Sequence, residues 1–115
     1  PFTVETMPVP KELKVNETAE IRCELKREGR WEDTRYTIRW FLFDGEGTLK
    51  LEDGTVLLPN DRYPLEKEMF RLYYTPLSGE QSSFTVWVED SDGQAVELEY
   101  DFNADNDKEG GDGTE

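Results

Sequence analysis

Histidine is absent from this sequence of 115 residues, and cysteine occurs only once, as Cys23. Without histidine the chain can form neither a Ser-His nor a Cys-His catalytic pair. A single cysteine cannot close an intramolecular disulfide, and it says little about the cellular compartment. The sequence also lacks a glycine-rich phosphate loop. It therefore predicts no catalytic residues, no metal ligands and no cofactor, and we expect a protein that is not an enzyme.

Basic residues are scarce as well. The chain has 13 Lys and Arg against 27 Asp and Glu, which gives a net charge of −14. Such a charge repels nucleic-acid phosphates and anionic lipid headgroups, so we expect no nucleic-acid partner. A signal peptide and an apolar run of membrane-spanning length are both missing. The chain starts at Pro1, which we interpret as a mature or trimmed form with an N-terminal segment removed.

Alternation of apolar and polar residues runs through most of the chain and predicts strands, since no window shows helical spacing. In AEIRCEL, residues 19–25, every second residue falls on one face. The same pattern covers residues 2–7, 36–43, 70–75, 83–89 and 95–102, and residues 47–58 form short strands about a turn at Asp53-Gly54. About seven or eight short strands separated by Gly, Pro and Asp are typical of a β-sandwich. We predict an all-β, immunoglobulin-like β-sandwich over residues 1–102, without a disulfide.

Three residues are predicted to form the centre of this core. Cys23 and Trp40 face inward by strand phase on the second and third strands, as in immunoglobulin domains. The matching cysteine of a late strand is missing, and Val86 occupies that neighbourhood.

The last residues break the strand pattern. NADNDKEGGDGTE, residues 103–115, is acidic and rich in glycine, with Ala104 as its only small apolar residue. It cannot bury enough apolar surface to offset its ordering entropy. We predict that residues 103–115 are a disordered acidic tail.

One segment resembles a calcium loop. In VEDSDGQAVELE, residues 88–99, placing Gly93 at loop position 6 gives acidic residues at positions 3, 5 and 12. Position 1 is then Val88, which has no ligand atom, and strands rather than helices flank the loop. Asp92-Gly93 between alternating apolar runs is instead a signal for a type I′ hairpin. We predict a hairpin and no metal site.

Aromatic residues on outward strand positions are the strongest candidate for a binding surface. If the third, sixth and seventh strands share a sheet, as in immunoglobulin domains, Arg39, Phe41, Phe43, Thr85 and Trp87 share its outer face. Large bare aromatic patches are uncommon on monomers, which favours the alternative that residues 57–65 fold over the patch and make a small second core. Tyr73 and Trp31 add aromatic surface elsewhere.

Several segments in combination resemble one protein family. These are MPVPK (7–11), EIRCEL (20–25), YTIRWFLFDGEGTL (36–49), LPND (58–61), FRLYYT (70–75) and VWVEDSDGQ (86–94). Together they are similar to the TraQ family of conjugative transposon proteins from Bacteroides-type bacteria, over residues 2–103. The resemblance implies a conjugation component in the cell envelope, periplasmic or anchored through a lipidated cysteine ahead of the folded part. It implies no catalytic residues.

The functional hypothesis is a non-catalytic docking or structural module that binds other conjugation proteins through Arg39, Phe41, Phe43 and Trp87. The alternative is a glycan- or surface-binding module in which Trp87, Phe41 and Tyr73 stack on sugars.

Overall fold

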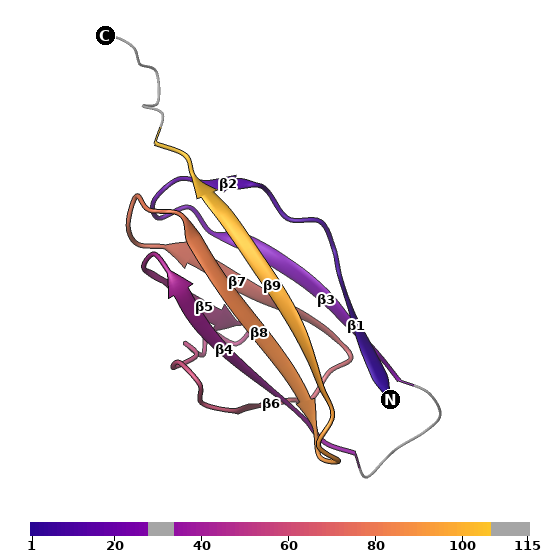
Figure 1. Ribbon diagram of the computed structural model, residues 1–115. Coiled ribbons are helices and arrows are strands. Elements are labelled where there is room, and N and C mark those ends of the chain that lie inside the picture. The colour runs from indigo at the N-terminus through magenta and orange to yellow at the C-terminus, as the bar shows by residue number, and fades with distance from the viewer. Residues whose placement is uncertain (28–33, 107–115) are drawn as a thin grey trace, which may run out of the picture.

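The computed structural model describes residues 1–27 and 34–106, and within them the regular secondary structure consists of β-strands alone (Figure 1). Nine strands follow one another in this part of the chain. They are β1 (Phe2–Thr6), β2 (Glu12–Leu13), β3 (Ala19–Arg27), β4 (Tyr36–Asp44), β5 (Gly47–Leu51), β6 (Tyr63–Leu65), β7 (Met69–Pro76), β8 (Ser82–Asp90) and β9 (Ala95–Ala104).

The strands form two sheets that face each other. The first sheet has the order β1-β3-β7-β5, and the second has the order β2-β9-β8-β4-β6. Neighbours are antiparallel except β2 and β9, which run parallel. This is the immunoglobulin arrangement, in which β4, β8 and β9 correspond to the strands that share one sheet. The predicted immunoglobulin-like sandwich is therefore confirmed, and so is the expectation that these three strands share a sheet.

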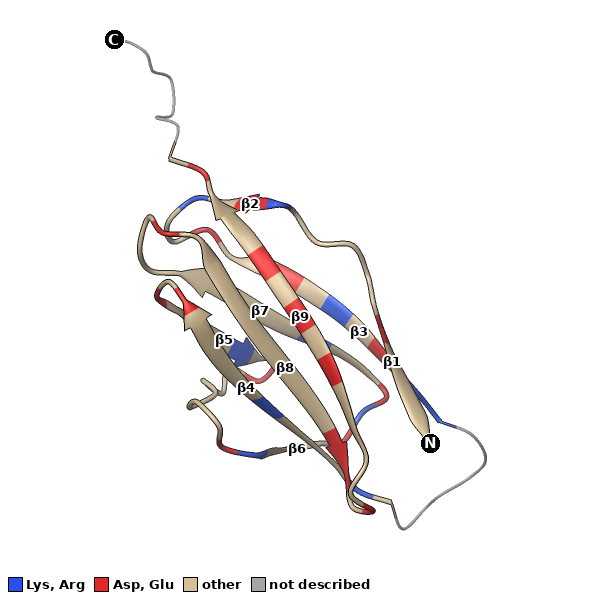
Figure 2. Cartoon of the chain, viewed as in Figure 1, with Lys and Arg blue, Asp and Glu red and all other residues tan. Residues whose placement is uncertain are grey.

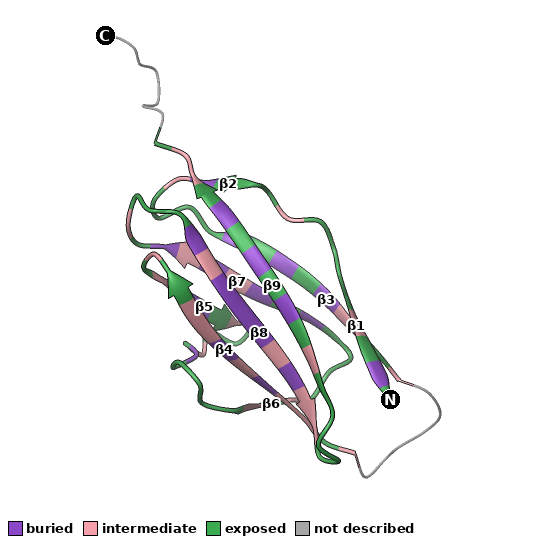
Figure 3. Cartoon of the chain, viewed as in Figure 1, coloured by how far each residue is buried: buried purple, intermediate pink, exposed green. Residues whose placement is uncertain are grey.

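Alternation of burial along β3 and β9 follows the two-residue period of a strand. In β3 every second side chain from Ala19 to Leu25 is buried, and in β9 Leu98, Tyr100 and Phe102 are buried between exposed acids (Figure 3). Burying one face of each strand against the other sheet supplies the main driving force for folding.

Trp40 lies near the middle of this core and is only 3% exposed. Its ring makes edge contacts with Tyr74 and Phe84, at centroid distances of 6.2 and 5.5 Å. Across the sheet it pairs with Val86, which is fully buried.

Cys23 is buried in the same core. Its Sγ lies 3.9 Å from the Tyr100 hydroxyl, which is also 3.0 Å from the Thr6 hydroxyl. Burial raises the pKa of the Cys23 thiol and that of the Tyr100 hydroxyl. Both groups therefore stay protonated near neutral pH, and the thiol is a small core side chain rather than a nucleophile.

The side of the sandwich between β5 and β4 is closed by residues 55–65, here called the closing segment. At one end it pairs with β5, where Leu57 N–H donates to Leu49 O at 2.9 Å. It then crosses to the second sheet, where Asn60 N–H donates to Trp40 O at 2.8 Å and β6 pairs with the start of β4. The Leu57 side chain is 2% exposed and completes the core from this side.

Strands β2 and β6 were not predicted. β2 has two residues and β6 has three, so neither shows an alternating pattern. β6 contains Pro64, which is tolerated because β6 is an edge strand, where the proline nitrogen needs no hydrogen-bond partner. β9 also runs two residues past the predicted domain end at 102, to Ala104.

Part of the predicted acidic tail is held by the fold. Asp105 N–H donates to Leu13 O at 2.9 Å, and its carboxylate lies 3.0 Å from Lys14 Nζ. The Asn106 side chain donates to Gly79 O at 3.3 Å. The remainder of the tail, residues 107–115, lies outside the described residues.

Packing explains the glycine at the start of β5, Gly47. A Cβ on Gly47 would overlap the phenol ring of Tyr74, whose hydroxyl donates to Ser82 Oγ at 2.7 Å inside the core. Gly45, by contrast, has a φ of +86°, as expected for a turn glycine.

The segment resembling a calcium loop is the β8–β9 hairpin. Asp90 Oδ1 accepts the N–H groups of Asp92 (3.0 Å) and Gln94 (2.8 Å), so this carboxylate caps the turn. Of the turn residues only Gly93 has a positive φ, +90°, whereas a type I′ turn needs two. The hairpin is thus confirmed, but the turn type was wrong: Asp90 N–H donates to Gln94 O, which closes a longer loop with Gly93 in the left-handed conformation.

We expect calcium to leave the thermal stability unchanged, because the Asp90 carboxylate is already occupied by backbone N–H groups. A site of micromolar affinity would add several kcal/mol at millimolar calcium. Melting curves with calcium and with chelator check this, and a calcium-dependent rise that Asp92→Asn abolishes would contradict it.

We expect Trp40→Ala to lower the free energy of unfolding by about 3–5 kcal/mol. It empties a large core volume and removes the hydrogen bond that the Trp40 indole N–H donates to Leu57 O at 2.9 Å. Urea denaturation measures the change. Val56→Ala is the control: Val56 belongs to the closing segment but is 44% exposed, so its loss should cost less than about 0.5 kcal/mol. A Trp40→Ala protein as stable as the parent would overturn this account of the core.

Candidate docking surface

The structure brings the predicted surface residues together on the outer face of the second sheet. Arg39 of β4 pairs with Trp87 of β8, and Phe41 pairs with Thr85. Thr85 lies between Phe41 and Glu99 in the register of the sheet and is only 8% exposed. We call Phe41, Phe43 and Trp87 the aromatic patch.

Phe43 owes its position to a β-bulge. The register of β4 against β8 shifts between Leu42 and Asp44, so that Leu42 pairs with Phe84 and Asp44 with Ser83. Phe43 is the extra residue and has no partner on β8. Its ring packs against Phe41 at a centroid distance of 5.0 Å, yet its side chain is 60% exposed. Bulges often re-aim a side chain at a functional site.

Arg39 holds Trp87 in place. Its guanidinium carbon lies 4.2 Å from the centroid of the Trp87 ring, within the range of a cation–π contact. On its other side the indole N–H of Trp87 donates to Glu97 Oε2 at 3.0 Å. Trp87 is therefore held between a cation from β4 and a carboxylate from β9, which reduces the entropy it can lose on binding.

A network of ion pairs anchors Arg39 in turn. Arg39 Nη1 donates to Asn60 Oδ1 at 3.1 Å, and Nη2 lies 3.4 Å from Glu89 Oε2. Arg62 Nε donates to Glu89 Oε1 at 2.6 Å. Hydrogen bonds from Arg62 and then from Arg39 outweigh burial and hold the pKa of Glu89 below its ordinary value. The network ties the closing segment to β4 and β8.

The closing segment does not fold over the aromatic patch. It follows the edge of β4, where Asn60 bonds to the backbone of Trp40 and to the side chain of Arg39. Phe43 is exposed, and Phe41 and Trp87 are half-buried among their neighbours. The predicted second core under residues 57–65 is replaced by a segment that completes the main core through Leu57.

An acidic row lies beside the patch. Glu97, Glu99 and Asp101 alternate along β9, point outward and are exposed; they are the red bands of β9 in Figure 2. The β8–β9 register places Glu97 beside Trp87, Glu99 beside Thr85 and Asp101 beside Ser83. The outer face is thus aromatic along β4 and β8 and acidic along β9.

The other predicted aromatics are elsewhere. Tyr73 of β7 pairs with Glu20 and Lys50, so it belongs to the outer face of the first sheet. Of the three residues named for sugar stacking, Trp87 and Phe41 therefore share one face, and Tyr73 lies on the opposite sheet. Trp31 lies outside the described residues.

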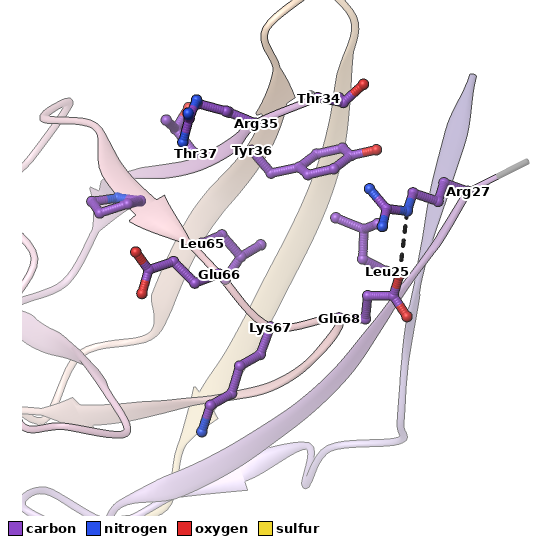
Figure 4. A pocket seen from close by; sticks show the side chains of 11 residues that line it. Leu25, Arg27, Thr34, Arg35, Tyr36, Thr37, Leu65, Glu66, Lys67 and Glu68 are labelled. Atoms are coloured by element: carbon purple, nitrogen blue, oxygen red, sulfur yellow. Dashed lines mark ion pairs between the residues drawn. The ribbon is translucent and has the colours of Figure 1, made fainter. Parts of the chain in front are cut away.

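A separate groove of about 350 Å³ opens where β3 and β6 end and β4 begins (Figure 4). At one end of the groove Arg27 Nε pairs with Glu68 at 3.3 Å, and the Arg27 guanidinium lies over the Tyr36 ring. None of the aromatic patch lines this groove. We place no site there.

Within residues 1–27 and 34–106, no cluster of three or more acidic or cysteine side chains is arranged to hold a metal ion. The same range contains no helix with the length and apolarity of a membrane span.

Comparison with known proteins identifies the family. The protein-family model described as TraQ conjugal transfer protein matches residues 1–105, nearly the whole described chain. The chain belongs to the TraQ family. The predicted resemblance is confirmed.

Solved structures of Bacteroides proteins are similar to this TraQ family member in both sequence and fold. A conjugative transposon lipoprotein from Bacteroides eggerthii is 57% identical, with a TM-score of 0.85 over 90% of this chain and 97% of that one. A lipoprotein from Bacteroides thetaiotaomicron is 61% identical, with a TM-score of 0.84 over 92% and 82% of the two chains.

A conjugate transposon protein from Bacteroides vulgatus is 47% identical, with a TM-score of 0.82 over 98% of this chain and 92% of that one. No curated protein sequence matches the chain. Family membership therefore connects the fold to conjugal transfer, whereas the binding role of Arg39, Phe41, Phe43 and Trp87 stays a prediction.

The Glu89 network predicts a pH dependence. Because the pKa of Glu89 is lowered in the folded state, its ion pairs stabilise the protein above the ordinary pKa near 4.5, and this contribution is lost as the pH falls through the lowered pKa. We expect Glu89→Gln to cost about 1 kcal/mol at pH 7 and much less at pH 3. Urea denaturation at both pH values measures this, and an equal cost at both would contradict it.

Proposed function

We propose that this chain is a non-catalytic docking module of the transfer apparatus of a conjugative transposon, located at the cell envelope. Membership of the TraQ family supports the role in conjugal transfer. Two similar proteins are named lipoproteins, which supports an envelope location with a lipid anchor. The proposed contact surface is the aromatic patch together with Arg39.

The observation that carries the docking role is the exposure of Phe43. An apolar ring that is 60% exposed contributes little to folding, and here a β-bulge places it outward next to Phe41. A partner that excludes water from such rings gains hydrophobic free energy. Aromatic and arginine side chains held in place before binding are typical hot-spot residues of protein interfaces.

Arg39 has a different part in this proposal. Its guanidinium is engaged with Trp87, Asn60 and Glu89, so it positions Trp87 more than it reaches for a partner. Support for a non-catalytic role comes from the sequence, which has no histidine, and from the buried, protonated thiol of Cys23.

We expect Phe43→Ala to leave the folded domain nearly as stable as the parent and to lower transfer frequency from donor cells by roughly tenfold or more. Trp87→Ala should act in the same direction on transfer, at a cost of about 1 kcal/mol in stability because it also removes contacts to Arg39 and Glu97. Mating assays with protein levels and melting temperatures measured on the same variants separate the two effects.

Tyr73→Ala is the matched control, since Tyr73 is an outward aromatic residue on the opposite sheet. Its transfer frequency should equal that of the parent. Wild-type transfer by a stable, normally expressed Phe43→Ala, Trp87→Ala double variant would rule out this docking surface.

A further inference from the structure

We propose that the partner at this surface presents a basic and apolar face: apolar side chains that cover Phe41 and Phe43, next to a row of Lys or Arg that meets Glu97, Glu99 and Asp101. The inference rests on the proposed docking function and adds the chemistry of the partner.

The aromatic patch and the acidic row are close enough for one partner to contact both. The pairing Phe41–Thr85–Glu99 runs straight across β4, β8 and β9. Adjacent strands are about 4.8 Å apart, so the carboxylates lie about 10 Å from the phenyl rings. A helix or a strand pair has this width.

The spacing within the acidic row describes the partner further. Alternate residues of a strand repeat at about 7 Å. Cations at alternate residues of a partner strand repeat at the same distance, and cations four residues apart on a helix repeat at about 6 Å. A partner segment with two or three Lys or Arg at either spacing, beside apolar residues, fits the row.

The charges of this face are not neutralised from within the described part of the chain. Arg39 and Arg62 both pair with Glu89. Glu97 accepts a hydrogen bond from Trp87, and Asp101 accepts one from Ser83 at 2.6 Å, but neither is ion-paired there. Glu99 has neither kind of contact within residues 1–27 and 34–106. The face therefore leaves three carboxylates for an external cation.

Complementarity of charge excludes other occupants. In a symmetric dimer through this face, the two acidic rows would come into the same interface as like charges, which is destabilising. The net charge of −14 repels nucleic acid and anionic lipid. A basic protein surface is attracted, and such attraction mainly speeds association and selects partners.

The test removes the charges and keeps the hydrogen bonds. The triple variant Glu97→Gln, Glu99→Gln, Asp101→Asn retains acceptors for the Trp87 and Ser83 donors. We expect unchanged melting temperature and a transfer frequency about tenfold lower, from three exposed pairs that each contribute about twofold. Glu99→Gln alone should lower the transfer frequency by about twofold. Because the Glu99 side chain makes no hydrogen bond within the described residues, this single variant tests the charge even if the triple variant folds poorly.

The control triple variant, Glu24→Gln, Glu52→Gln, Glu80→Gln, removes the same charge away from this face and should transfer normally. If the acidic-row variants transfer normally while Phe43→Ala does not, the basic partner is wrong and the docking surface stands. If Phe43→Ala and Trp87→Ala also transfer normally, the proposed function itself is wrong.

Charge reversal identifies the partner. Glu99→Lys should lower transfer further, and selection for restored transfer should yield Lys→Glu or Arg→Glu changes in another transfer protein. Suppressors that leave the charge of every other transfer protein unchanged would overturn the inference.

Discussion

The hydrogen bond from the Trp40 indole to the Leu57 carbonyl, 2.9 Å long, connects the core to the closing segment. The closing segment leaves β5 at Leu57, whose side chain enters the core. Three residues later, Asn60 reaches the edge of β4 and bonds to Trp40 O. From there Asn60 meets Arg39, and Arg62 meets Glu89. The orientation of Trp87 on the outer face thus depends on a contact made by the side chain at the centre of the core.

The closing segment also protects the sandwich from association through its edges. β5 and β4 would otherwise present unpaired N–H and C=O groups along one side of the molecule, which invites pairing with other chains. Residues 55–57 pair with β5, and Asn60 and β6 pair with β4. The closing segment therefore hinders strand addition at β5 and β4 on this side of the sandwich.

Alternation made the long strands predictable from the sequence, because inward and outward side chains follow the pleat directly. For the same reason the shared outward phase of Arg39, Phe41 and Trp87 was correct. The short strands β2 and β6 depend on pairing with residues far along the chain and leave no local pattern. The bulge at Phe43 is a property of the register between two strands, and the Asp90 cap lengthened a turn whose Asp-Gly pair suggested a shorter one. The Arg39–Glu89–Arg62 network could not be predicted, because it depends on the path of the closing segment. No sequence periodicity encodes that path.

The composition of this network argues that the outer face is built to hold Trp87 rather than to stabilise the fold. Arg39 Nε is buried without a hydrogen-bond partner among the described residues, which costs about 1–3 kcal/mol. A pair of apolar residues at positions 39 and 87 would cover the strand without that cost. Lysine could not replace the arginine, since only the planar guanidinium can stack on the indole while it donates to Asn60 and Glu89 in different directions. A polar network that stabilises little but fixes one aromatic ring beside two others is the arrangement expected of a surface whose free-energy gain comes on binding.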